Sequence, residues 1–105
     1  MSLKNIYKGY DQAKKPGYDQ LITHTDHGTP AGEYLRRYWH PVTLSSEVTT
    51  TPLEIRILGE DLVIFKTTEN KIGLVHKHCT HRRASLVFGK SESKGLRCCY
   101  HGWLF

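Results

Sequence analysis

Apolar and polar side chains alternate along the middle of the chain in a pattern typical of β-strands. Residues 53–58 (LEIRIL) place apolar side chains at every second position, as expected for a strand with one buried face. A turn at Gly59 and Glu60 leads into residues 61–66 (DLVIFK), so the two segments predict a β-hairpin. Residues 72–76 (IGLVH) predict a third strand.

The first part of the chain is polar and predicts an arm in front of the strands. Residues 1–28 show little periodicity and are interpreted as extended. Thr29 followed by Pro30 is typical of a helix start, with the threonine as N-cap and the proline at the first helical position. The predicted helix covers residues 30–38 and must end before Pro41, because the residue preceding a proline disfavours the helical region.

These patterns together predict a mainly β protein, with antiparallel strands preceded by an extended arm and a short helix. At 105 residues the chain has room for one domain with a modest core. We divide it into an arm at residues 1–37 and a β domain at residues 38–105. Trp39 and His40 are expected to anchor the arm at the start of the β domain.

Composition and charge narrow the classes of function. Three cysteines are an odd number, so a metal-binding use in the cytoplasm fits better than a disulfide framework. No run of about 18 apolar residues is present to span a membrane, and the N-terminus lacks the apolar stretch of a secretory signal. The net charge of +5 is scattered and no recognition motif accompanies it, so we expect no nucleic-acid partner. The charge either steers an acidic redox partner or is simply a solvated surface.

Two cysteine–histidine segments carry the candidate chemistry. Cys79 and His81 form a C-x-H pair, and Cys98 and His101 form a C-x-x-H pair. Two thiolates and two imidazoles are the ligand set of a Rieske [2Fe–2S] centre, in which two histidines replace two cysteines on one iron. The spacing predicts that each iron is held by both segments. Gly102 is expected to let the backbone approach the sulfides closely.

Other arrangements of the same residue types compete with this interpretation. A zinc site with two cysteines and two histidines is the alternative, but the C-x(2–4)-C pair that zinc commonly uses is absent. His24, Asp26 and His27 form the one 2-His-1-carboxylate candidate for a mononuclear iron, and their spacing favours an ordinary loop. Cys99 adjoins a predicted ligand and is expected to be a packed, inert thiol.

With these residues in view, the chain resembles the Rieske-type ring-hydroxylating oxygenases, at the N-terminal end of their catalytic alpha subunit. The resemblance runs from about residue 28 to residue 105. It rests on four segments in addition to the cysteines and histidines: 28–42 (GTPAGEYLRRYWHPV), 58–63 (LGEDLV), 82–86 (RRASL) and 95–98 (GLRC). The last two segments are most similar to the phthalate-dioxygenase-like branch.

The resemblance implies a Rieske-type β domain that passes single electrons to a mononuclear non-haem Fe(II). The implied ligands of the [2Fe–2S] cluster are Cys79, His81, Cys98 and His101. A reductase or ferredoxin is the implied electron donor, and the full-length parent is expected to be a homo-oligomer, a trimer, acting on an aromatic substrate. In the family, further strands and a catalytic domain follow the second Cys–His segment. We therefore expect this chain to be a truncated part of an oxygenase, without the catalytic iron site.

A contrast with other Rieske proteins predicts a low reduction potential. Ala84 and Tyr100 stand where the high-potential Rieske proteins of respiratory complexes have a disulfide, and Trp103 stands where they have a cluster-bonding serine. Fewer hydrogen bonds to the sulfurs favour a potential near the bottom of the range of roughly −150 to +300 mV.

Two alternatives to the oxygenase interpretation stay open at this point. A stand-alone Rieske-type ferredoxin would be an electron carrier and not an enzyme. The segment 28–39 favours the oxygenase, because small ferredoxins generally begin near the β domain. A zinc-stabilised binding module is the second alternative.

Overall fold

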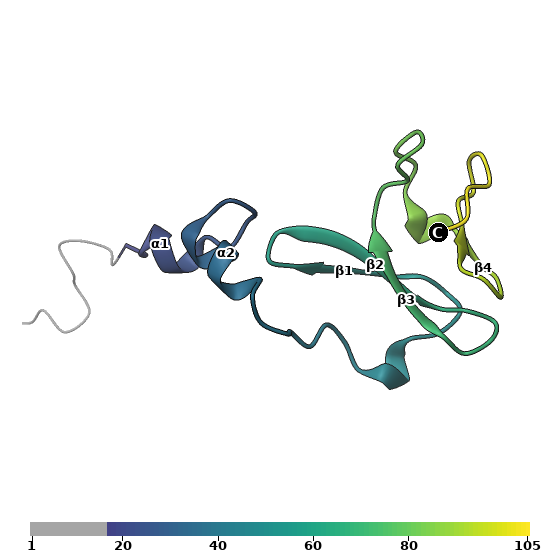
Figure 1. The fold of residues 1–105 in the computed structure, drawn as a ribbon, viewed down its shortest axis with the longest axis horizontal. Helices are drawn as coiled ribbons and strands as arrows, with labels where there is room; N and C mark the ends of the chain where they lie inside the picture. Colours follow the sequence, from purple (N-terminus) through teal and green to yellow (C-terminus); the bar gives the residue numbers. More distant parts are fainter. Residues whose placement is uncertain (1–16) are drawn as a thin grey trace, which may run out of the picture.

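A computed structural model describes residues 17–105 (Figure 1). Two short helices form the arm, a three-stranded sheet lies in the middle, and a two-stranded sheet lies at the other end. The elements in chain order are α1 Gln20–Thr23, α2 Pro30–Leu35, η2 Ser45–Glu47, β1 Leu53–Ile57, β2 Glu60–Lys66, β3 Ile72–His76, η3 Leu86–Phe88, β4 Lys90–Ser91 and β5 Leu96–Arg97. The part of the predicted arm at residues 1–16 lies outside the described residues.

The helix predicted after Thr29 is present as α2, and its cap has the expected geometry. The Thr29 hydroxyl accepts a hydrogen bond from the amide of Gly32 at 3.1 Å, and Pro30 occupies the first helical position. The helix ends at Leu35, before the predicted end at Tyr38. It stops there because the following amides bond to carbonyls three residues back, at 3.1 and 3.2 Å, which is 3₁₀ geometry.

Two other expectations for the arm are wrong. Residues 20–23 form the single helical turn α1, whose start is capped by the Asp19 carboxylate accepting from the amide of Leu21 at 2.9 Å. A helix of one turn is too short to leave an apolar periodicity in the sequence. Trp39 does not anchor the arm, because its side chain is fully exposed. His40 does make an anchoring contact, with Nε2 at 2.6 Å from the carbonyl oxygen of Leu35.

The three-stranded sheet confirms the predicted hairpin and the predicted third strand. β1 pairs with β2 and β2 with β3, both antiparallel, so β2 is the central strand. The turn lies one residue earlier than predicted: Leu58 and Gly59 connect β1 to β2, and both have positive φ, 51° and 78°, as a two-residue hairpin turn requires. β3 occupies the predicted residues and leads directly into the first Cys–His segment. The mainly β, antiparallel fold class is confirmed.

The hydrophobic core lies between the two sheets. Its buried members are Val63, Phe65, Cys79, Leu86, Leu96 and Cys98, with Val75, Ala84, Val87 and Phe105 packed around them. Both sheets therefore contribute, and two of the cysteines are core residues. No helix within residues 17–105 has the length and apolar character needed to cross a bilayer.

Candidate metal centre

The two Cys–His segments lie side by side at the end of the molecule opposite the arm (Figure 1). The first Cys–His loop, residues 79–83, follows β3, and the second Cys–His loop, residues 98–103, follows β5. The β4–β5 hairpin between them carries the chain out and back, and His81 of the first loop then lies against His101 of the second. The predicted site residues of both segments are thus brought together.

The first Cys–His loop is closed by backbone hydrogen bonds. The amide of Cys79 donates to the carbonyl of Ala84 at 2.8 Å, and the amide of Arg83 donates back to the carbonyl of Cys79 at 2.7 Å. Arg83 has a φ of 61°, in the left-handed region that reverses the chain. Nδ1 of His78 lies 3.2 Å from the Arg83 carbonyl oxygen. These contacts fix the backbone that presents Cys79 and His81.

The second Cys–His loop is closed in a similar way, with Gly102 at its turn. The amide of Cys98 donates to the carbonyl of Trp103 at 2.7 Å, and the amide of Gly102 donates to the carbonyl of Cys98 at 3.1 Å. Gly102 has a φ of 76°, and a Cβ there would meet no atom nearer than Cδ of Arg97 at 4.0 Å. The glycine is therefore needed for its left-handed backbone, and the close approach to the sulfides of a cluster stays a prediction.

The cysteines of the two loops face each other inside the core. Cys79 is 2% exposed and Cys98 is 3% exposed, and the Cys79 side chain hydrogen-bonds to that of Cys98. Cys99 points the other way and is exposed, so the prediction of a packed thiol is wrong there. The chain enters a turn at Cys99, directly after the buried Cys98, and this turn leaves the Cys99 side chain outside the core.

The backbone around Cys98 favours its thiolate form. The amide of Tyr100 lowers the pKa of the Cys98 thiol by hydrogen bonding to the sulfur, while burial opposes the shift. The Cys79 side chain and the amide of His101 lower this pKa further. Because the thiolate is the metal-binding form of cysteine, these donors prepare the position for a metal.

The histidines of the two loops form a second pair at the surface. The exposed rings of His81 and His101 meet edge to face, with centroids 4.8 Å apart and an interplanar angle of 74°. Trp103 stacks on His81 at 4.5 Å and 13°, and Tyr100 packs on His101 at 3.9 Å. The aromatic neighbours of both imidazoles were not predicted from the sequence, although they stand in the same Tyr-His-Gly-Trp segment.

The four side chains therefore come as two pairs, and this division matches a binuclear centre. Within residues 17–105, no three His, Cys, Asp or Glu side chains gather where they could hold one metal ion. A single zinc ion takes four ligands around one point, whereas each iron of a [2Fe–2S] cluster takes two protein ligands. Two buried thiols and two exposed imidazoles, each pair drawn from both loops, fit the [2Fe–2S] donor set.

Comparison with known proteins identifies the family. Residues 38–105 match the family described as the Rieske [2Fe–2S] domain. The chain belongs to this family. The Rieske domain is thus the part of the chain that contains both sheets and both Cys–His loops.

Oxygenase subunits are among the relatives of this Rieske domain. The alpha subunit of phenoxybenzoate dioxygenase from Ectopseudomonas oleovorans is 54% identical over 91 residues, which are 86% of this chain and 22% of the relative. A crystal structure of apo dicamba monooxygenase superposes with a TM-score of 0.63 at 30% identity, covering 68% of this chain and 22% of that one. The reduced complex between oxygenase and ferredoxin of carbazole 1,9a-dioxygenase has a TM-score of 0.54 at 28% identity, over 65% and 18%. The chain spans about a fifth of the length of the oxygenase relatives it matches.

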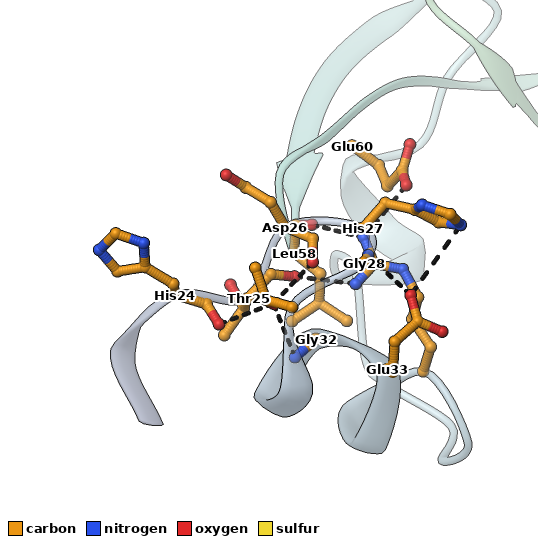
Figure 2. A network of polar contacts seen from close by, with 11 residues as sticks. His24, Thr25, Asp26, His27, Gly28, Gly32, Glu33, Leu58 and Glu60 are labelled. Atoms are coloured by element: carbon orange, nitrogen blue, oxygen red, sulfur yellow. Dashed lines mark hydrogen bonds and ion pairs between the residues drawn. The ribbon is translucent and has the colours of Figure 1, made fainter. Parts of the chain in front are cut away.

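The 2-His-1-carboxylate candidate of the arm consists of His24, Asp26 and His27, and each of them contacts a different neighbour. His24 stacks on Tyr18 at 5.8 Å, and His27 lies 3.9 Å from the carboxylate of Glu33. Figure 2 shows the two imidazoles on opposite sides of this segment. The carbonyl of Asp26 accepts from the Thr29 hydroxyl at 2.7 Å, as part of the helix cap. These residues connect the loop before α2 to its neighbours.

Arg36 fastens the arm to the tip of the β1–β2 hairpin. Its guanidinium donates to the carbonyls of Thr25 and Leu58, both at 2.8 Å, and to Oε1 of Glu60 at 3.1 Å. Figure 2 shows the arm segment and the hairpin tip meeting at this point. The Rieske domain and the arm are thus joined by polar contacts far from the Cys–His loops.

Proposed function

We propose that Cys79, His81, Cys98 and His101 hold a Rieske [2Fe–2S] cluster, the two cysteines on one iron and the two histidines on the other. The observation that carries this is the division of the four side chains into one thiol pair and one imidazole pair, each drawn from both loops. When bound, the cluster would accept and release one electron at a time.

The surroundings of the two pairs suit different tasks. Burial among core residues keeps water away from Cys79 and Cys98, and the amide of Tyr100 favours the Cys98 thiolate. His81 and His101 are exposed, so a redox partner can approach their face directly. The chain thus offers a sheltered thiolate side and an open imidazole side.

The whole protein is proposed to be an oxygen-activating enzyme, with this domain supplying electrons to a mononuclear non-haem iron. The names of its relatives support this, because one is a dioxygenase alpha subunit and another a monooxygenase. The alternative of a stand-alone ferredoxin is not favoured, because the match to the dioxygenase alpha subunit covers 86% of this chain and thus includes part of the arm. An aromatic substrate and a trimeric parent remain predictions from the family resemblance.

A ferredoxin or reductase is the proposed electron donor. A structural relative contains an oxygenase bound to its ferredoxin, which supports this class of partner. Arg82 and Arg83 are exposed beside His81, and we propose that their charges draw an acidic partner to this face. A cytoplasmic location, which the unpaired cysteines favour, likewise remains a prediction.

Iron and sulfide analysis of the 105-residue chain tests the ligand assignment. The purified chain should contain two irons and two sulfides per molecule and give a Rieske-type EPR signal after reduction. Cys98→Ser should lose the cluster, whereas Cys99→Ser, which removes the exposed neighbouring thiol, should retain it. A colourless protein with one zinc, or equal cluster content in the two variants, would contradict the proposal.

The reduction potential tests the comparison with high-potential Rieske proteins. All three cysteines are free, so no disulfide joins the two loops. We propose a reduction potential near the bottom of the range of about −150 to +300 mV. The reason is that this chain lacks the disulfide and the serine of high-potential Rieske proteins, so fewer hydrogen bonds reach the sulfurs of the cluster. Protein-film voltammetry of the iron-loaded chain measures this value, and a potential in the upper half of the range would contradict the proposal.

A further inference from the structure

Arg97 joins the second Cys–His loop to the β4–β5 hairpin by three hydrogen bonds. Its Nε donates to Oε2 of Glu92 at 2.6 Å, and its Nη2 donates to Oε1 of the same carboxylate at 2.9 Å. Its remaining nitrogen, Nη1, donates to the carbonyl of Gly102 at 2.7 Å. One planar group therefore holds a carboxylate on one side and a loop carbonyl on the other.

The carbonyl that Arg97 holds belongs to the residue directly after His101. Gly102 also closes the loop through its own amide, which donates to the carbonyl of Cys98 at 3.1 Å. Both polar groups of the Gly102 peptide backbone are thus tied to the segment at residues 97–98. The part of the chain between these ties contains Tyr100, whose amide bonds to the Cys98 sulfur.

We propose that Arg97 is a positioning residue for the cluster: held by Glu92, it fixes Gly102 and thereby sets the placement of His101 relative to Cys98. This inference rests on the proposed function, since it gives Arg97 a role toward a cluster that Cys98 and His101 are proposed to bind. Neither Arg97 nor Glu92 touches the metal in this assignment. Glu92 matters because it leaves the guanidinium only one orientation.

The shape of the side chain is essential to this role. A guanidinium presents donors in a rigid plane and can serve a carboxylate and a carbonyl at once. A lysine at the same position keeps the positive charge but offers a single nitrogen on a flexible chain. Arg97→Lys therefore separates the geometric effect from the electrostatic effect of a cation close to the cluster.

Arg36 offers a matched control elsewhere in the chain. It also donates to backbone carbonyls and to a carboxylate, but at the hairpin tip beside the arm. Arg36→Gln removes a clamp of the same kind without touching the Cys–His loops. An effect that Arg36→Gln shares with Arg97→Gln would come from a general loss of stability.

The experiment compares Arg97→Gln, Arg97→Lys and Arg36→Gln with the unaltered iron-loaded chain. The measurements are the rate of iron release to a chelator, the EPR g-values of the reduced form and the reduction potential. Both Arg97 variants should release iron about tenfold faster, by analogy with other groups that orient metal ligands. Their EPR g-values should shift, and Arg97→Gln alone should also lower the potential by removing a cation. Arg36→Gln should leave all three measurements unchanged.

Each outcome decides between defined possibilities. An unaltered chain without a cluster would overturn the proposed function, and the role of Arg97 with it. A loaded unaltered chain whose Arg97 variants match it in iron release and g-values would overturn the role of Arg97 alone. Equal acceleration in Arg36→Gln would do the same. If circular dichroism shows that Arg97→Gln does not fold, Arg97→Lys decides by the same criteria.

Discussion

The arm and the second Cys–His loop, at opposite ends of the described chain, are each fastened by one arginine, but they rest on different supports. At the arm, α1 has no buried side chain and α2 buries only Gly32, so the Arg36 contacts are the main attachment. At the loops, Arg97 lies between Leu96 and Cys98, both of which are core residues. The loop clamp therefore adds to a hydrophobic support that the arm lacks.

Stability is distributed unevenly along the chain. A single hydrogen bond contributes about 1 kcal/mol net, so an attachment made of a few of them opens easily. Contacts between side chains in the core are broken only when the core itself opens. The thiol pair therefore belongs to the region that unfolds most cooperatively. The two thiols proposed to bind metal are therefore held where local opening is least frequent.

Truncation of an apolar side chain should destabilise the chain far more beside the Cys–His loops than in the arm. Leu96 is completely buried, so Leu96→Ala should lower the free energy of unfolding by about 2–5 kcal/mol. Leu21 in α1 is 63% exposed, and Leu21→Ala should change it by less than about 0.5 kcal/mol. Urea unfolding of the metal-free chain measures both. Similar losses at the two positions would show that the arm is supported as firmly as the loops.

Two glycines with similar backbone angles lie in the two regions, Gly28 in the arm and Gly102 in the second Cys–His loop. Gly102 has a φ of 76° and Gly28 a φ of 86°, and a Cβ would meet no atom within 4 Å at Gly28 and only one at that distance at Gly102. An alanine at either position should cost about 1–2 kcal/mol through backbone strain. Only Gly102→Ala should also reduce the iron content, because only that turn contains proposed ligands. Iron analysis together with thermal unfolding checks this, and an equal loss of iron in Gly28→Ala would contradict it.

Two carboxylates give the smallest expected effect, through pH. The Arg97 guanidinium lowers the pKa of Glu92 below 4.5, and the amide of Gly28, which donates at 2.8 Å, lowers that of Glu33. A depressed pKa in the folded chain means that the stabilisation is present above pH 4.5 and is lost as the pH falls through the folded value. Acid should therefore loosen both contacts while the core persists. NMR titration of the carboxyl carbons measures each pKa, and a value at or above 4.5 for either would contradict the assignment.

The sequence predicted the parts of the fold that repeat a simple period or a ligand pattern. The third strand has the predicted bounds, because its apolar residues are followed at once by the polar Cys–His segment. The Thr29 cap was predictable for a similar reason, since threonine before proline has one common structural use. The meeting of the two Cys–His loops was predicted from the ligand spacing, which requires both segments to hold each iron.

Features that depend on distant contacts were not predictable in this way. The one-turn helix α1 depends on a side-chain cap and leaves no apolar period. The exposure of Cys99 depends on which side of the loop backbone faces the core, and the loop has no regular period to show this. The role of Arg97 could not be derived from its type, because the carbonyl it holds is defined only once the loop is closed.

The inclusion of Cys79 and Cys98 in the core gives a bound metal centre a mechanical role. A cluster attached to both cysteines would cross-link two points about 20 residues apart, as a disulfide does, and such a loop closure is worth about 3 kcal/mol through the unfolded state. The same two sulfurs would then serve as a redox site and as a covalent brace between the sheets. For this domain, loss of the inorganic centre would therefore also lower the stability of the fold and make the chain easier for cellular proteases to cleave.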